Sequence, residues 1–157
     1  MYNRILVPVD GSEAANRGLM EAIAMAKSGG GALRLVHVVN ELMLGTGYPP
    51  TMYYDQLIES MREGGKEILR NAEAVVREHR AESQSVLLES IGGRAADLIV
   101  EQARQWPADV IVMGTHGRRG LKRLVMGSDA EMVLSLSPVP VLMVRAVRGS
   151  GGKTVDE

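Results

Sequence analysis

Five short apolar runs alternate with four helical patterns along this chain, and the alternation restricts the fold more than any other feature. The apolar runs are expected to be strands, at residues 5–9, 33–39, 85–91, 110–113 and 139–144. A repeated strand–helix order calls for a parallel sheet with helices on both faces. Right-handed crossovers then give a doubly wound α/β fold, in which ligands bind at the carboxyl ends of the strands where the strand order reverses.

Polar residues and glycines mark the expected helix ends. Asp10 or Ser12 can cap the first helix, and the glycine-rich residues 28–31 stop it. Residues 41–54, which contain two glycines and two prolines, are expected to be a loop long enough to suggest function or mobility.

The second helix is expected over about residues 55–80. Its apolar face would comprise Leu57, Met61, Ile68, Ala72, Val75 and Val76. Gly64 and Gly65 predict a bend or weak point within it, because each costs about 1 kcal/mol relative to alanine in a helix.

The composition is that of one globular domain. With 157 residues the chain can form a single core, so we expect a domain at 1–146 and a flexible tail at 147–157. A net charge of −1 gives no general attraction to nucleic acid or to an anionic membrane. The chain has no cysteine, and no apolar run reaches the ~18–20 residues of a membrane span, so a cytoplasmic location is expected.

A glycine-rich, basic segment follows the buried run at residues 110–113 and leads into a helix. Its glycines and serine have the spacing Gly-x2-Gly-x9-Gly-Ser, from Gly114 through Gly117 and Gly127 to Ser128. Glycines let backbone N–H groups approach an anion, and a helix start adds unpaired donors and a positive dipole. The segment therefore predicts a phosphate site. If strands one and four are neighbours, Asp10 lies opposite Gly114, where it either accepts hydrogen bonds from a ribose or only caps the first helix.

Taken together, these segments resemble the universal stress protein family, and in particular its ATP-binding branch. The resemblance covers about residues 3–146 and adds four segments to the glycine loop: Ile-Leu-Val-Pro-Val-Asp-Gly-Ser at 5–12, Leu-Val-His-Val at 35–38, Ala-Asp-Val-Ile-Val-Met-Gly at 108–114 and Pro-Val-Pro-Val-Leu-Met-Val at 138–144. It implies a five-stranded parallel sheet of order 3-2-1-4-5 and a bound adenine nucleotide, ATP or else ADP or AMP.

The resemblance also implies roles for individual residues. Pro8, Val9 and Asp10 would line the adenosine site, Val38 would meet adenine through its backbone, and Met113 would pack near the base. Gly114, His116 and Gly117 would begin the phosphate loop, and Gly127, Ser128 and Ala130 would close on the phosphates. The Ser128 hydroxyl can also meet a bound Mg²⁺. Asp129 is a departure from the family pattern; we expect it to point outward as a favourable first-turn acid.

Three functions remain open on this basis. The first is a nucleotide sensor that hydrolyses ATP slowly or not at all, since the chain has no evident general base or second substrate domain. The second is an ATPase or transferase that uses Ser128, His116 or Asp10. The third is a dimeric adaptor that binds no nucleotide.

Two further expectations concern histidines and assembly. His116 is expected to form hydrogen bonds or pack rather than catalyse, and His37 to be a hydrogen-bonded core histidine. A homodimer is expected through strand five, from Val139 to Val144, because that strand is an apolar sheet edge and relatives pair it with its copy. Pro140, expected inside this strand, would restrict where that pairing begins.

Overall fold

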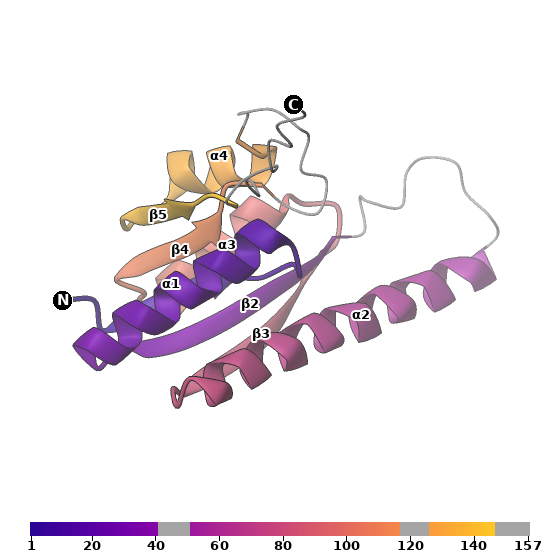
Figure 1. Ribbon diagram of the computed structural model, residues 1–157. Coiled ribbons are helices and arrows are strands. Elements are labelled where there is room, and N and C mark those ends of the chain that lie inside the picture. Colours follow the sequence, from indigo (N-terminus) through magenta and orange to yellow (C-terminus); the bar gives the residue numbers. More distant parts are fainter. Residues whose placement is uncertain (41–50, 117–125, 147–157) are drawn as a thin grey trace, which may run out of the picture.

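A computed structural model of the protein describes residues 1–40, 51–116 and 126–146. Within these ranges strands and helices alternate (Figure 1). In chain order the elements are β1 (Arg4–Pro8), α1 (Glu13–Gly29), β2 (Ala32–Asn40), α2 (Thr51–Glu78), β3 (Ser83–Ser90), α3 (Ala95–Gln105), β4 (Val110–Gly114), α4 (Ser128–Leu136) and β5 (Val141–Val144). The expected tail, residues 147–157, lies outside the described residues. No helix in the described ranges is long and apolar enough to cross a membrane.

The five strands form one parallel sheet with the order β3-β2-β1-β4-β5. This confirms the predicted doubly wound fold. The order reverses between β1 and β4, because the chain moves outward from β1 to β2 and β3 on one side and from β4 to β5 on the other. The carboxyl ends of β1 and β4 are therefore the place where a crevice is expected in such a sheet.

Two layers of helix enclose the sheet. On one face α1 and α2 cover Ile5, Val7, Leu33, Leu35, Val110 and Val112. On the other face α3 and α4 cover Leu6, Val36, Ile111 and Met113. Successive residues of a strand point to opposite faces, so strands that are apolar throughout, such as β4, are buried on both.

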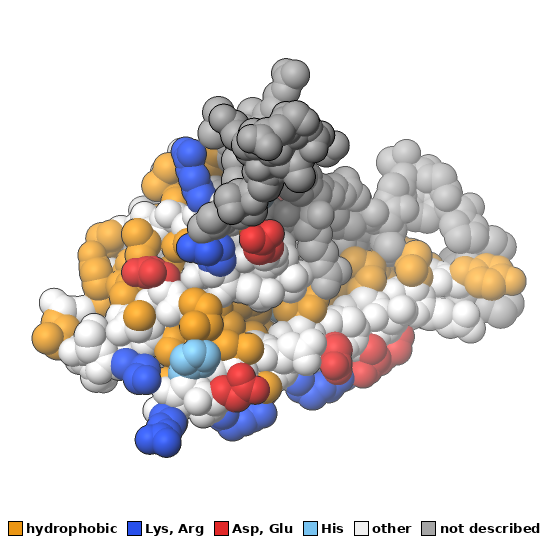
Figure 2. Space-filling model, in the orientation of Figure 1, with side chains coloured by type: hydrophobic (Ala, Val, Ile, Leu, Met, Phe, Trp, Pro, Cys, Tyr) orange, Lys and Arg blue, Asp and Glu red, His pale blue; other side chains and the backbone are white. Residues whose placement is uncertain are grey.

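The long helix α2 differs from its prediction at its start and in its buried stripe. It begins at Thr51, so Tyr53 and Tyr54 belong to the helix and not to the expected loop. It continues through Gly64 and Gly65 as one helix, so the two glycines do not end it, and a bend at this point stays a prediction. Its buried stripe is Ile58, Gly65, Leu69, Ala72 and Val76, whereas Leu57 is 43% exposed. The outer face carries ion pairs one turn apart, Glu59–Arg62, Glu63–Lys66 and Glu67–Arg70. Figure 2 shows acidic and basic side chains next to each other along this helix.

The last strand also begins later than expected. β5 starts at Val141, and Pro140 lies just before it, which corrects its expected position inside the strand. The carbonyl of Pro140 accepts the N–H of Ile111 at 3.0 Å. Since this contact uses only the carbonyl, the missing N–H of proline costs the ladder with β4 nothing.

Candidate functional site

The loops that follow β1 and β4 meet at the point where the strand order reverses, as predicted. Asp10 accepts the N–H of Ser12 at 2.8 Å, which closes a tight turn after β1. Ser12 is the N-cap of α1: its hydroxyl oxygen accepts the N–H of Ala15 at 3.2 Å. The same hydroxyl lies 3.4 Å from the carbonyl oxygen of His116, to which it donates. Of the two capping candidates, Ser12 is therefore the cap and Asp10 shapes the turn.

Gly114 fits against α1 because it has no side chain. A Cβ at this position would lie 2.6 Å from the carbonyl carbon of Ala14 and 2.7 Å from the nitrogen of Ala15. Gly18, one turn further along α1, is also close to β4, since its Cβ would lie 3.3 Å from the carbonyl carbon of Met113. The start of α1 thus rests directly on the end of β4, a close approach that the absence of a side chain at Gly114 allows.

Thr115 is a residue of this site that the sequence analysis missed. It is 5% exposed, and its N–H donates to the carbonyl of Val144 at 2.9 Å. Its own carbonyl accepts the N–H of Gly127 at 2.8 Å. Thr115 therefore fixes the end of β5 and the start of α4 to the end of β4. The N–H of Gly127 is engaged in this contact in the present structure.

His116 carries a buried polar atom without a partner. Its Nδ1 lies 2.9 Å from the hydroxyl of Thr115. Its Nε2 is fully buried and has no hydrogen-bond partner among the described residues. A buried ring nitrogen without a partner costs free energy, and a ligand group placed at this position would remove that cost. If the Thr115 hydroxyl donates to Nδ1, then Nε2 carries the proton and can donate to a ligand oxygen.

The start of α4 offers donors to an anion. The first bond within the helix runs from Glu131 N–H to the carbonyl of Gly127 at 3.0 Å. The N–H groups of Ser128, Asp129 and Ala130 precede it and have no partner within the helix. No side chain caps this helix among the residues described. Ser128 and Asp129 are exposed and Ala130 is buried; the outward orientation of Asp129 stays a prediction.

The other predicted contacts lie around the same edge. The ladder between β1 and β2 ends at Pro8 and Val36, although β2 continues to Asn40 beside β3. The backbone of Val38 therefore lies beyond the last residue pair that joins β1 to β2. Val9 is 4% exposed, and Met113 is 7% exposed within the α3–α4 core. Gly117 and the basic residues Arg118, Arg119, Lys122 and Arg123 lie outside the described residues.

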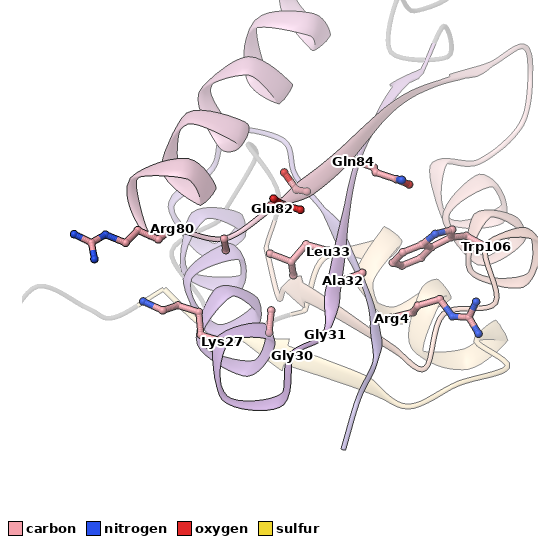
Figure 3. Close-up of a pocket in the computed structure, with 13 residues that line it drawn as sticks. Arg4, Lys27, Gly30, Gly31, Ala32, Leu33, Arg80, Glu82, Gln84 and Trp106 are labelled. Atoms are coloured by element: carbon pink, nitrogen blue, oxygen red, sulfur yellow. The ribbon is translucent and has the colours of Figure 1, made fainter.

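A surface cavity of about 710 Å³ lies at the opposite, amino edge of the sheet. Figure 3 shows Lys27 and Arg80 pointing outward on one side of it, and Arg4 and Trp106 on the other. The charged groups diverge instead of converging on one point. The carboxyl edge therefore remains the candidate site.

The comparisons with known proteins identify the family. The model of the universal stress protein family matches residues 1–145. The chain belongs to the universal stress protein family. It is 30% identical to universal stress protein YxiE of Bacillus subtilis, over 92% of this chain and 100% of that protein.

Solved structures of the family share the fold. UspA from Lactobacillus plantarum superposes with a TM-score of 0.79 at 26% identity, covering 92% of this chain and 98% of that one. The universal stress protein of Archaeoglobus fulgidus in complex with dAMP superposes with a TM-score of 0.64 at 30% identity, covering 91% and 98%. Membership in this family thus rests on both sequence and fold.

Proposed function

We propose that this protein binds an adenine nucleotide, ATP in the first instance, at the carboxyl edge of β1 and β4 and acts as a regulator. The observation that carries the proposal is the junction of the two loops, where Ser12 contacts His116 beside the unpartnered His116 Nε2. The 30% identical Archaeoglobus fulgidus protein in complex with dAMP supports the class of ligand. The preference for ATP over ADP or AMP is proposed from the spacing of the glycine loop.

The adenosine half would lie over the end of β1. Pro8, Val9 and Asp10 line the proposed nucleoside position, and the open backbone edge at Val38 receives the base. Met113, whose side chain is almost entirely buried, would form part of the floor of the site. The carboxylate of Asp10 holds its turn through Ser12, and in this proposal it also accepts a ribose hydroxyl.

The phosphate half would lie between Gly114 and α4. His116 Nε2 and the N–H groups of Ser128 and Ala130 provide the donors, with Gly117 and Gly127 allowing close approach. Among the described residues no three His, Asp or Glu side chains cluster as a metal site. A Mg²⁺ ion in this site would therefore be held mainly by phosphate oxygens, with the Ser128 hydroxyl as a protein ligand.

Slow or absent hydrolysis follows from the same residues. Asp10 is engaged by the backbone of its own turn, and His116 is held by Thr115. Neither arrangement places a base beside an attacking water, which efficient phosphoryl transfer requires. The protein in this proposal reports nucleotide levels by binding.

The proposal includes a homodimer formed through β5. This strand is at the edge of the sheet, and Leu142 within it is 38% exposed. Leu134 and Leu136 at the end of α4 are also exposed, by 48% and 40%. Uncovered strand edges favour pairing with another strand. Light scattering during gel filtration checks this: a monomer at micromolar concentration contradicts it.

The test of nucleotide binding compares the natural protein with Gly127→Val. Gly127 has φ −62° and ψ 150°, which any residue adopts, so valine adds bulk next to the proposed phosphate position without straining the backbone. Mass spectrometry of co-purified nucleotide and calorimetric titration with ATP, ADP and AMP provide the readouts. We expect tight binding that the variant loses, with little phosphate released over hours.

The other outcomes identify the alternatives. Rapid phosphate release that depends on Ser128, His116 or Asp10 would establish an enzyme instead. A folded protein that binds none of the three nucleotides would be the nucleotide-independent adaptor, and the glycine loop would then be structural.

A further inference from the structure

His37 connects the proposed nucleotide site to helix α2. It lies in β2, and its Nδ1 is 2.7 Å from the carbonyl oxygen of Val9. A carbonyl only accepts hydrogen bonds, so Nδ1 carries a proton and donates it. The N–H of Val9 donates in turn to the carbonyl of Val36 at 2.8 Å. Both backbone groups of Val9 are thus bound to β2, one of them through a side chain.

This side-chain bond replaces a ladder bond at the place where the ladder stops. The pairing of β1 with β2 ends at Pro8, and the chain then turns through Asp10 into α1. The imidazole of His37 holds the last backbone carbonyl before that turn. The position of Asp10, and with it the proposed ribose contact, therefore depends on where the imidazole ring lies.

The ring is positioned in turn by α2. A Cβ on Gly65 would lie 2.8 Å from Cδ2 of His37 and 2.8 Å from Cδ1 of Leu87. The His37 ring thus packs on the bare backbone of the helix. The neighbouring Gly64 has no atom within 4 Å of the place where its Cβ would be. Of the two glycines, only the buried Gly65 is needed for this close packing.

A second contact holds α2 at the same level of the sheet. Arg62, one turn before Gly65, donates from Nε to Glu89 Oε1 at 2.6 Å and from Nη2 to Glu89 Oε2 at 3.1 Å. Glu89 is near the carboxyl end of β3, beside Val39 of β2. A two-bond guanidinium–carboxylate pair fixes orientation as well as distance. This pair therefore holds α2 in the position in which Gly65 meets the His37 ring.

We propose that His37 is a positioning residue that couples the placement of α2 to nucleotide binding. The coupling rests on the proposed function, and it is reciprocal: a nucleotide that fixes Val9 and Asp10 also stabilises one position of α2. Helix α2 runs beside β2 and β3 and carries exposed Tyr53 and Leu57 toward its amino end (Figure 1). Nucleotide occupancy would reach that surface through His37.

The adjacent glycines provide a matched pair of variants. Gly65→Ala should push the His37 ring aside and raise the dissociation constant for ATP about fivefold or more. Gly64→Ala adds the same methyl group to the same helix, facing open space, and should leave the constant unchanged. Equal dissociation constants in the two variants would overturn the coupling.

Two substitutions of His37 separate the effect of its hydrogen-bond donor from the effect of its size. Removal of one hydrogen bond in His37→Leu should weaken ATP binding about tenfold, whereas His37→Asn, whose amide can donate from the Nδ1 position, should stay within about threefold. If Gly65→Ala does not fold, this pair carries the test. Loss of affinity that Asn does not rescue would mean that His37 acts through packing alone, against the proposal.

Imidazole ¹⁵N NMR tests the geometry without nucleotide. His37 should show a protonated Nδ1, and its ¹⁵N shifts should move in Gly65→Ala and not in Gly64→Ala. Addition of ATP should shift them again. ATP binding without any change at His37 refutes the coupling alone, whereas absence of ATP binding in the natural protein refutes the proposed function and the coupling together.

Discussion

Gly114→Ala is the substitution for which the structure gives the most direct magnitude. The added Cβ would lie 2.6 Å from the carbonyl carbon of Ala14, about 0.8 Å closer than the shortest ordinary van der Waals contact of 3.4 Å. The atoms in its way belong to the backbone of the first turn of α1, so no side-chain rotation relieves the clash. Either α1 or the end of β4 has to move.

The expected loss of stability has two parts. Overpacking a close contact costs about 1–3 kcal/mol. Displacing the first turn of α1 also weakens its Ser12 cap, which is worth about 1 kcal/mol. We therefore expect Gly114→Ala to lower the free energy of unfolding by about 2–4 kcal/mol. Because Ser12 contacts His116, nucleotide affinity should fall as well.

Urea denaturation followed by circular dichroism measures this, with Gly64→Ala as the control. Gly64 is exposed inside α2 and has open space around it. Alanine there should raise the free energy of unfolding by about 0.5–1 kcal/mol, because glycine loses more backbone entropy in a helix. If the dependence of the unfolding free energy on urea concentration is the same in all three proteins, the shifts of the midpoints measure changes in stability. A Gly114→Ala protein within 0.5 kcal/mol of the natural one would refute the contact.

Two further predictions concern the ends of elements. Asp109 accepts the N–H groups of Arg4 and Asn3, each at 2.8 Å, and these bonds lower its carboxyl pKa below 3.8. A lowered folded-state pKa contributes stability above about pH 3.8 that is lost as pH falls through the folded value. Asp109→Asn should therefore be less stable than the natural protein at neutral pH. Urea titrations should show this difference in unfolding free energy closing below pH 3.8. A difference that does not depend on pH would contradict this explanation. Ser12→Ala should cost about 1 kcal/mol by the same assay, whereas Ser12→Asp, which can also cap, should cost less.

The strands were predictable because each contains a short apolar run near residues that end a strand. β4 is buried on both faces, which agrees with its four consecutive large apolar residues before a glycine. The meeting of the β1 and β4 loops followed from the strand alternation together with the doubly wound topology. The strand order itself came from the family resemblance, since local periodicity does not specify which strands are neighbours.

The face of α2 was harder to predict because its sequence offers two apolar stripes. Leu57 and Ile58 each begin a series at helical spacing, and the sheet contacts the one that starts at Ile58. Gly65 decides between them, since its bare backbone meets His37 and Leu87. Propensity alone treats such a glycine as a helix breaker, and only the packing partner reveals it as a point of close approach.

Thr115 and His37 escaped functional assignment for a related reason. The partners of both residues lie on elements that are distant along the chain, and local sequence does not specify them. In the fold, Thr115 bonds across to β5 and to the start of α4, and His37 bonds across to β1. Their roles depend on strand neighbours that are distant along the chain.

The two glycine contacts make the site depend on helix positions. At Gly114 the start of α1 rests on β4, and at Gly65 the body of α2 rests on the ring that holds Val9. A contact through bare backbone has no side chain to absorb a displacement, so movement of either helix should reach the loops of the proposed nucleotide site. Stability and affinity should therefore change together at these two positions, while at the exposed Gly64 stability should change alone. Measuring stability and affinity in Gly114→Ala, Gly65→Ala and Gly64→Ala therefore distinguishes a site positioned by its helices from one positioned by its loops.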